Sequence, residues 1–305
     1  MTPQRLGLLA GVGAYLLWGL LPLYWPLLEP AGAVEILAHR IAWSLVFVVA
    51  LLALTSGFGW LRSVGRRRAG MLALAAVLVT ANWGTYIYGV NHERVVETSL
   101  GYFINPLVTV LLAVVVLREH LRPRQWVGIG IAAVAVAILT ADYGHPPWIA
   151  LILAGSFGLY GLVKKRVGME GTQSLAVETG FMVVPAVTYL LVLGANGGGT
   201  FTTQGTGHAI LLVLAGTVTA VPLILFGASA IRVPLATLGL LQYLAPTMQF
   251  LIGVLIRGEP MPATRLAGFA LVWLALAVFT ADALHAARRA HVRRRAQEAA
   301  VAELV

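Results

Sequence analysis

The chain has 305 residues, of which 59% are hydrophobic and 11% are charged, and its mean hydropathy is +0.86. Soluble domains carry about 25% charged residues, so the composition excludes a soluble protein and indicates a polytopic membrane protein. The net charge of +9 does not indicate a nucleic-acid partner, because the basic residues stand in short segments between apolar runs, as juxtamembrane charges do. The absence of cysteine excludes disulfides and thiolate metal sites.

The first apolar run covers residues 6–28 and follows Arg5. The small residues at 30–33 resemble the cleavage site of a secretory signal. The run is longer than the roughly 7–15 apolar residues of such a signal, however, and further apolar runs follow. We therefore expect a retained first transmembrane helix.

Ten apolar runs are long enough to be helical spans, since about 20 apolar residues in a helix cross a bilayer. The sequence thus predicts an all-α integral membrane protein with ten transmembrane helices. The longest connection, residues 195–207, is rich in Gly and Thr, which is typical of a flexible exposed loop. The predicted spans are residues 6–28, 34–55, 69–91, 96–117, 125–142, 147–163, 174–193, 209–231, 234–256 and 263–284.

The basic residues predict the orientation of these spans. Ten spans place both termini on one side, and the tail after residue 285 is strongly basic. Seventeen of the 21 Lys and Arg residues fall on the side of the tail, and only Arg94, Arg257 and Arg265 fall in segments on the other. Because cytoplasmic loops carry the excess of positive charge, we expect a multi-pass protein of the cytoplasmic (inner) membrane with both termini in the cytoplasm.

The two halves of the chain resemble each other at an offset of 140 residues. Pro106 falls on Pro246, Glu119 on Glu259, and the triplet TAD at 140–142 on TAD at 280–282. The sequence therefore predicts one five-helix repeat at 1–143, a second at 144–285, and a basic cytoplasmic tail at 286–305. Since five is odd, the repeats would be inverted, as in many secondary transporters whose substrate site lies near the midplane. Duplication in a membrane protein that transports nothing is the alternative.

Several segments in both halves carry a family resemblance: EILAHR (35–40), ANWGTYIYGVN (81–91), SLGYFINPL (99–107), SFGLYGLVKK (156–165) and LGLLQYLAPT (238–247). With its two repeats, the chain resembles the EamA family of the drug/metabolite transporter superfamily, and within it the RarD-type permeases. The resemblance extends to about residue 285. It implies a transmembrane transporter that exports small molecules.

Polar residues inside spans are candidates for substrate binding, because they are costly there and usually face the bundle interior. Asn82 and Tyr86 share a face of the third span, and Trp83 lies next to them. Asn82 offers a donor and an acceptor to a ligand. It could equally form an interhelical hydrogen bond that holds the bundle together.

Proline with polar neighbours marks the fourth and ninth spans. Tyr102 and Asn105 precede Pro106, which removes a backbone donor and is expected to kink the helix. A carbonyl freed at this kink could bind a ligand, or Asn105 could simply cap the break. The related residues of the ninth span are Gln242, Tyr243, Pro246 and Gln249.

Trp18 and Tyr160 occupy related positions in the two repeats and are candidates for an aromatic wall against an amphipathic solute. Packing or anchoring at the membrane interface is the simpler interpretation. Glu119 and Glu259 stand beside Arg118 and Arg257, and we interpret them as solvated charges at the membrane edge or as partners of these arginines.

The second span begins with Glu35, His39 and Arg40. Glu35 is matched by Glu178 in the second repeat, whereas His39 and Arg40 have no polar counterpart. We expect Arg40 to lie in the membrane, within an outward-facing ion-pair or substrate gate. The topology makes Glu97 its nearest candidate carboxylate.

These features favour a secondary active permease that exports small metabolites or drugs by alternating access. The sequence contains no phosphate-binding loop, so the driving force must be a gradient; Glu35, Glu178 and His39 are candidates for a proton carrier. A flippase for lipids or lipid-linked precursors is the alternative. An intramembrane enzyme is disfavoured because HExxH and comparable catalytic motifs are absent. We expect a small-molecule substrate, contact with membrane lipid, no cofactor and no metal, and we leave a homodimer open.

Overall fold

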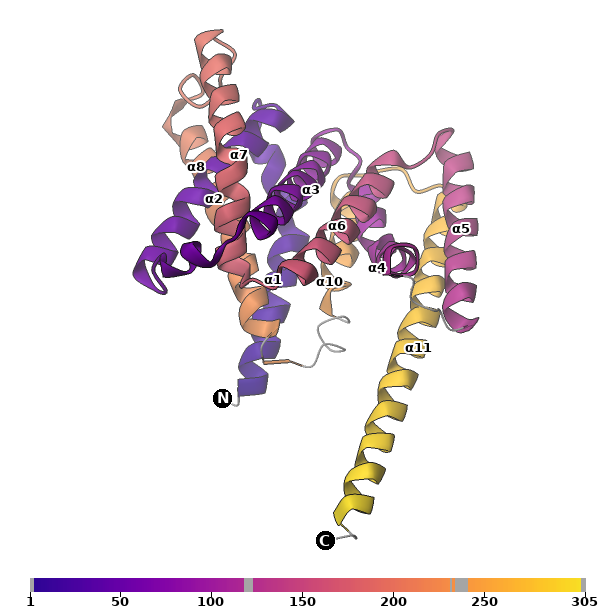
Figure 1. Ribbon diagram of the computed structural model, residues 1–305. Coiled ribbons are helices and arrows are strands. Elements are labelled where there is room, and N and C mark those ends of the chain that lie inside the picture. The colour runs from indigo at the N-terminus through magenta and orange to yellow at the C-terminus, as the bar shows by residue number, and fades with distance from the viewer. Residues whose placement is uncertain (1–2, 118–122, 231, 234–240, 303–305) are drawn as a thin grey trace. The chain divides into compact units, whose positions relative to one another are not determined.

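The computed structural model describes residues 3–302 apart from 118–122, 231 and 234–240 (Figure 1). This part of the chain is helical and contains no β-strand, as the sequence predicts. Two short 3₁₀ segments are η1 (Trp25–Leu28) and η2 (Gly59–Ser63), and a π-helical segment is η3 (Ile252–Ile256). The α-helices are α1 (Pro3–Tyr24), α2 (Ala33–Leu54), α3 (Arg66–Asn91), α4 (Val95–Leu117), α5 (Pro123–Tyr143), α6 (Trp148–Val167), α7 (Gly171–Ala195), α8 (Gly205–Ala230), α10 (Leu244–Leu251) and α11 (Ala263–Ala302).

Seven helical stretches of the described chain are long and apolar enough to cross a membrane, and two more apolar helices, Trp148–Lys164 and Leu244–Ile256, are shorter. The protein is therefore an integral membrane protein. Helices α1 to α8 begin and end within a few residues of the predicted spans, because apolar length determines both. The helix α11 differs, since it continues through the predicted basic tail to Ala302.

The two prolines of the repeat have different surroundings. The helix α4 continues through Pro106 without interruption. In the ninth predicted span, Gln242 and Tyr243 form a turn, and α10 begins after them with Pro246 in its first turn. A proline is tolerated there because the first amides of a helix have no intrahelical acceptor.

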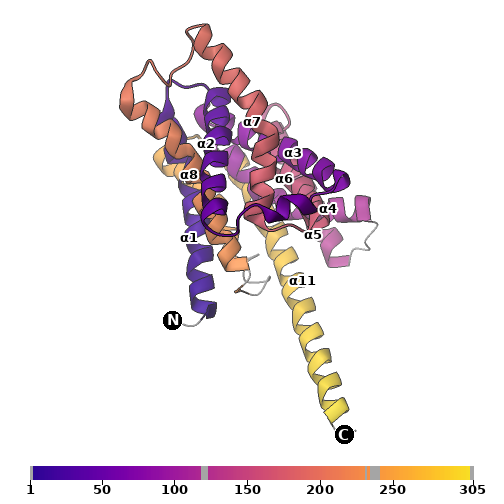
Figure 2. The same ribbon diagram turned by 60° about the vertical axis from the view of Figure 1, so that its left-hand side comes forward.

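The chain forms two compact units, residues 1–109 with 148–260 and residues 110–147 with 261–305. In the first unit, α2 packs against α7 and α8, as both views show (Figures 1 and 2). The helix α3 packs against α6 and α7, and α1 packs against α8 and α10. Gly216 permits the close approach of α8 to α2, because a side chain there would collide with the backbone of Trp43.

A buried cluster of the first unit surrounds η1 and the beginning of α2. It brings together side chains from α1, η1, α2, α3, α4, α6 and α8 and so fixes these elements around the polar residues described below. Its buried members are Leu21, Trp25, Leu28, Ala31, Ile36, Tyr86, Ile87, Val90, Val95, Ile149, Leu153, Leu212 and Ala215.

The second unit is built on the packing of α5 against α11. Gly128 of α5 lies against the ring of Phe279, and Gly268 of α11 lies against Leu139. Small residues at such crossings let membrane helices approach closely. At the end of α5, Asp142 accepts a hydrogen bond from Arg265 Nε at 2.8 Å.

Candidate functional site

The first turns of α2 bury three ionisable side chains. Glu35, His39 and Arg40 have exposed fractions of 3%, 6% and 3%. Ionisable groups inside a membrane helix are costly and almost always face the bundle interior or a water-filled path. The contacts of each side chain therefore indicate what this part of the molecule can do.

Arg40 lies between two tryptophan rings. Its guanidinium carbon is 4.1 Å from the ring centre of Trp83 on α3 and 5.1 Å from that of Trp25 on η1. Such cation–π contacts stabilise a desolvated cation by about 2 kcal/mol. Within the described chain, Nε and Nη1 of Arg40 donate no hydrogen bond, and no carboxylate forms an ion pair with this side chain.

The expectation that Glu97 pairs with Arg40 is wrong. Glu97 accepts a hydrogen bond from the amide of Ile149 at 3.1 Å and lies 3.8 Å from Nη1 of Arg94. The reason is that Glu97, in the first turn of α4, faces the beginning of α6, whose first amides have no intrahelical acceptor.

Two tyrosines complete the surroundings of Arg40. The hydroxyls of Tyr86 and Tyr102 lie close enough to interact electrostatically with its guanidinium, and their rings pack edge to face with centres 5.6 Å apart. Tyr86 is 2% exposed. Neither its hydroxyl nor Nε1 of Trp25 has a hydrogen-bond partner in the residues that the structure describes. We call Trp25, Arg40, Trp83, Tyr86 and Tyr102 the Arg40 cluster.

Asn82 joins three helices beside this cluster. Its Nδ2 donates to the carbonyl of Leu153 at 2.9 Å and to Oγ of Ser156 at 3.1 Å, both on α6. Its Oδ1 accepts a hydrogen bond from the Tyr102 hydroxyl at 3.3 Å. These contacts favour the interhelical role for Asn82, which positions Tyr102 toward Arg40.

Glu35 is bound by the connection between α7 and α8. Its Oε1 accepts hydrogen bonds from the amide of Thr200 at 2.7 Å and from the Thr200 hydroxyl at 2.9 Å. That hydroxyl also lies 2.8 Å from Nε2 of His208. The expected exposure of residues 195–207 is thus wrong at Thr200, which is 8% exposed.

His39 stacks on Phe201 of the same connection, with ring centres 4.9 Å apart. Its two ring nitrogens have no hydrogen-bond partner among the described residues. Sequence reasoning missed Thr200, Phe201 and His208, because a Gly/Thr-rich loop carries no signal for contact with a helix more than 150 residues away.

Glu178 forms a second buried carboxylate site, between α6 and α7. It is 1% exposed and accepts hydrogen bonds from Lys164 Nζ at 2.8 Å, the Tyr160 hydroxyl at 3.0 Å and the Ser174 hydroxyl at 2.6 Å. Lys164 also contacts Ser174. Sequence reasoning missed Lys164 and Ser174. The i,i+4 spacings of Tyr160 with Lys164 and of Ser174 with Glu178 are the signal that could have found them.

The structure places Trp18 and Tyr160 in different groups. Trp18 packs with Tyr15 and Phe226, at ring-centre distances of 5.4 Å and 5.8 Å. Tyr160 packs with Phe157 at 5.9 Å. In the described chain no contact between Trp18 and Tyr160 is found.

The polar residues near Pro106 and Pro246 lie on α4, on α10 and in the turn before α10. Gln249 Nε2 donates to the carbonyl of Trp18 at 3.1 Å, joining α10 to α1. Asn105 accepts a hydrogen bond from the Thr109 hydroxyl at 3.4 Å, within α4. Gln242 and Tyr243 lie in the turn before α10.

Glu259 is not only a membrane-edge charge. Its carboxylate accepts hydrogen bonds from the amides of Val95 at 2.5 Å and Val96 at 2.9 Å, and so caps the N-terminus of α4. The related prediction for Glu119 lies outside the described residues, as does Arg118.

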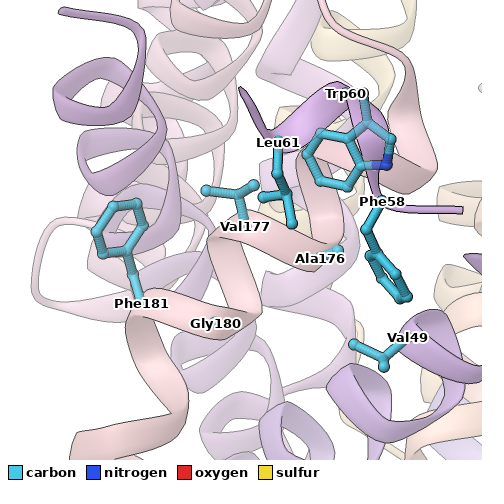
Figure 3. Close-up of a pocket in the computed structure, with 8 residues that line it drawn as sticks. All are labelled: Val49, Phe58, Trp60, Leu61, Ala176, Val177, Gly180 and Phe181. Atoms are coloured by element: carbon cyan, nitrogen blue, oxygen red, sulfur yellow. The ribbon is translucent and has the colours of Figure 1, made fainter. Parts of the chain in front are cut away.

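An apolar pocket of about 300 Å³ lies between α2, η2 and α7 (Figure 3). Its one polar side-chain atom, Nε1 of Trp60, donates to the carbonyl of Gly57 at 2.9 Å. The pocket contains none of the predicted site residues, and the described residues include no group of three His, Cys, Asp or Glu able to hold a metal. The pocket is lined by Val49, Phe58, Trp60, Leu61, Ala176, Val177, Gly180 and Phe181.

Known proteins resemble this chain along most of its length. The family model of the EamA-like transporter family matches residues 5–141. Protein RarD of Streptomyces exfoliatus is 58% identical, over 95% of this chain and 93% of its own. The chain belongs to the EamA-like transporter family. Within this family it is a RarD-type permease, as Protein RarD of Escherichia coli, 38% identical over 93% of this chain and 97% of its own, also supports.

Other relatives carry transporter names without a substrate. "Uncharacterized transporter YojE" of Bacillus subtilis is 45% identical, over 88% of this chain and 91% of its own. A solved structure described as "Crystal structure of protein" is 20% identical and superposes with a TM-score of 0.58, covering 92% of this chain and 98% of that one. At this identity the likeness concerns the fold alone. The chain is thus a membrane transporter, and its relatives are named as transporters rather than as enzymes.

Proposed function

We propose that this RarD-type permease is a secondary active transporter that exports small metabolites or drugs across the cytoplasmic membrane by alternating access. The observation that carries the proposal is the Arg40 cluster. Burying a cation whose donors are unpaired is costly for a helix bundle, and intramembrane charges commonly mark substrate or ion paths.

The packing of α5 against α11 supports an inverted repeat, with five-helix units at 1–143 and 144–285. At the offset of 140, Gly128 corresponds to Gly268, and Leu139 corresponds to Phe279. The contact of Gly128 with Phe279 therefore has its counterpart in the contact of Gly268 with Leu139. Reciprocal contacts of this kind are what a two-fold axis between repeats produces.

The two buried glutamates suit the two ends of an alternating-access path. With both termini in the cytoplasm, Glu35 and the connection holding Thr200 face outward, while Glu178, Lys164 and Ser174 face the cytoplasm. Each glutamate joins α2 or α7 to a neighbouring element. If the contacts of Glu35 are released while those of Glu178 persist, only the outer side opens. The reverse would open only the cytoplasmic side. The basic tail at 286–305 lies on the cytoplasmic side in this topology.

Proton coupling is a further part of the proposal, with Glu35, Glu178 and His39 as the candidate carriers. The basis is their burial and the absence of a nucleotide-binding loop. Export that does not change when the proton gradient is dissipated would contradict this part and leave transport itself intact.

A flippase for lipids or lipid-linked precursors is the second candidate, and the apolar pocket beside Trp60 is the observation that favours it. Comparing the metabolites of cells with and without the gene tests both. Accumulation of a water-soluble metabolite inside cells lacking the gene is expected for an exporter. Accumulation of a lipid-linked precursor instead would favour the flippase.

A further inference from the structure

The Arg40 cluster is rich in hydrogen-bond donors and poor in acceptors. Nε and Nη1 of Arg40, Nε1 of Trp25 and the hydroxyl of Tyr86 are buried donors without a partner in the described chain. They come from α2, η1 and α3. Buried donors in native proteins nearly always have acceptors, and each unpaired one costs about 1–3 kcal/mol.

The nearby acceptors are already engaged. Oδ1 of Asn82 accepts from the hydroxyl of Tyr102, Glu35 is bound by Thr200, and Glu97 is bound by the amide of Ile149. The charge of Arg40 is also uncompensated by any carboxylate within the described chain. A partner for this cluster must therefore supply both oxygen acceptors and one negative charge.

We propose that the Arg40 cluster binds the carboxylate of a small organic monoanion, which is the substrate class of the transporter proposed above. A carboxylate matches the planar fork of a guanidinium, and it can accept from the neighbouring indole and phenol as well. One cation neutralises a carboxylate, whereas a phosphate dianion would keep a charge in the membrane. The aromatic side chains that surround the guanidinium fit a substrate whose remainder is apolar or aromatic.

Access to the cluster requires movement of the surrounding elements. Trp25 is 0% exposed and Arg40 is 3% exposed, so the structure holds the donors shut off from both sides of the membrane. The connection that covers His39 and binds Glu35 lies on the side that the topology makes external. During the transport cycle, the carboxylate would enter and leave this closed cluster when the surrounding elements move.

A matched pair of ligands tests the proposal on the intact purified protein. Benzoate and benzamide have nearly the same shape but differ in charge. Isothermal titration calorimetry in detergent should give saturable one-site binding of benzoate and at least tenfold weaker binding of benzamide. Chloride at the same concentration should displace little benzoate. Equal binding of benzoate and benzamide, or displacement of benzoate by equimolar chloride, would overturn the proposal without the use of any variant.

Variants then assign the site. Arg40→Gln should weaken benzoate binding by at least tenfold, Arg40→Lys should weaken it less, and Arg62→Gln on the exposed segment η2 serves as the matched control. Size-exclusion chromatography checks that each variant is folded. Undiminished benzoate binding by folded Arg40→Gln would place the anion elsewhere. Because binding is measured without flux, failure here leaves the transport proposal standing, and failure of transport leaves this site standing.

Discussion

At Arg40, two indole rings lie against the guanidinium, and no carboxylate of the described chain forms an ion pair with it. The energy of a cation–π contact falls steeply with distance, so the nearer ring, that of Trp83, should contribute more than that of Trp25. The cation–π energy is larger inside a membrane helix than on a solvent-exposed surface, because water does not compete for the guanidinium.

Replacing Trp83 tests this arrangement at a single residue. Trp83→Ala should lower the stability by about 2 kcal/mol or more, because the guanidinium loses its closer aromatic face. Trp83→Phe should lower it less, since a smaller ring remains. Thermal unfolding in detergent measures both. Equal stability of wild type and Trp83→Ala would mean that the ring does not support Arg40.

Burial of Arg40 could be predicted from the sequence, since it follows Glu35 into a long apolar run. Its neighbours could not be predicted. Trp25 and Trp83 reach Arg40 from η1 and α3, and no local pattern specifies such a contact. Topology alone suggested Glu97, which the structure instead places against the amide of Ile149.

Among the helices, an ion pair joins the consecutive helices α6 and α7. Lys164 and Glu178 are 2.8 Å apart, and their side chains are 21% and 1% exposed. Removing one partner of a fully buried pair typically costs about 3–5 kcal/mol, and the cost is smaller for Glu178→Gln because the charge left on Lys164 is partly hydrated. Replacing both avoids this penalty.

We therefore expect Glu178→Gln and Lys164→Met each to lower the melting temperature more than the double variant does. Differential scanning fluorimetry of the three variants measures the coupling. Additive losses in the double variant would show that the two side chains act independently.

The helices α5 and α11 allow a test of the repeat. Gly128→Ala and Gly268→Ala should each destabilise the protein by about 1–3 kcal/mol, because the added methyl group meets Phe279 or Leu139. Gly130→Ala is the control on the same helix, since open space surrounds it. Unfolding of the three variants in detergent gives the comparison. Loss of stability in only one of the two repeat-related variants would argue against equivalent contacts.

The bounds of most helices could be predicted from apolar length, but their junctions could not. The capping of α4 by Glu259 joins residues more than 160 positions apart, and the repeat alignment indicated only that Glu259 has a counterpart. The turn at Gln242 and Tyr243 agrees with the expectation of a break near Pro246, because proline disfavours an uninterrupted helix. Pro106 carries the same local signal, yet α4 continues through it.

At the scale of the whole molecule, the expected topology can be tested directly because the natural chain contains no cysteine. Ser63→Cys should lie on the cytoplasmic side and Thr202→Cys outside, and both positions are exposed. A membrane-impermeant maleimide added to intact cells should label Thr202→Cys and should label Ser63→Cys only after permeabilisation. The reverse pattern would invert the topology and exchange the roles proposed for Glu35 and Glu178.

Membership of the EamA-like transporter family makes transport the activity to measure, and movement of a solute without its chemical change is the central claim. Counterflow in proteoliposomes tests it most directly, with the compound that accumulates inside cells lacking the gene as the labelled solute. We predict uptake of the label against a preloaded unlabelled pool, faster than in protein-free liposomes and greatly reduced by Arg40→Gln. Uptake equal to that of protein-free liposomes, or conversion of the label into another compound, would contradict the account.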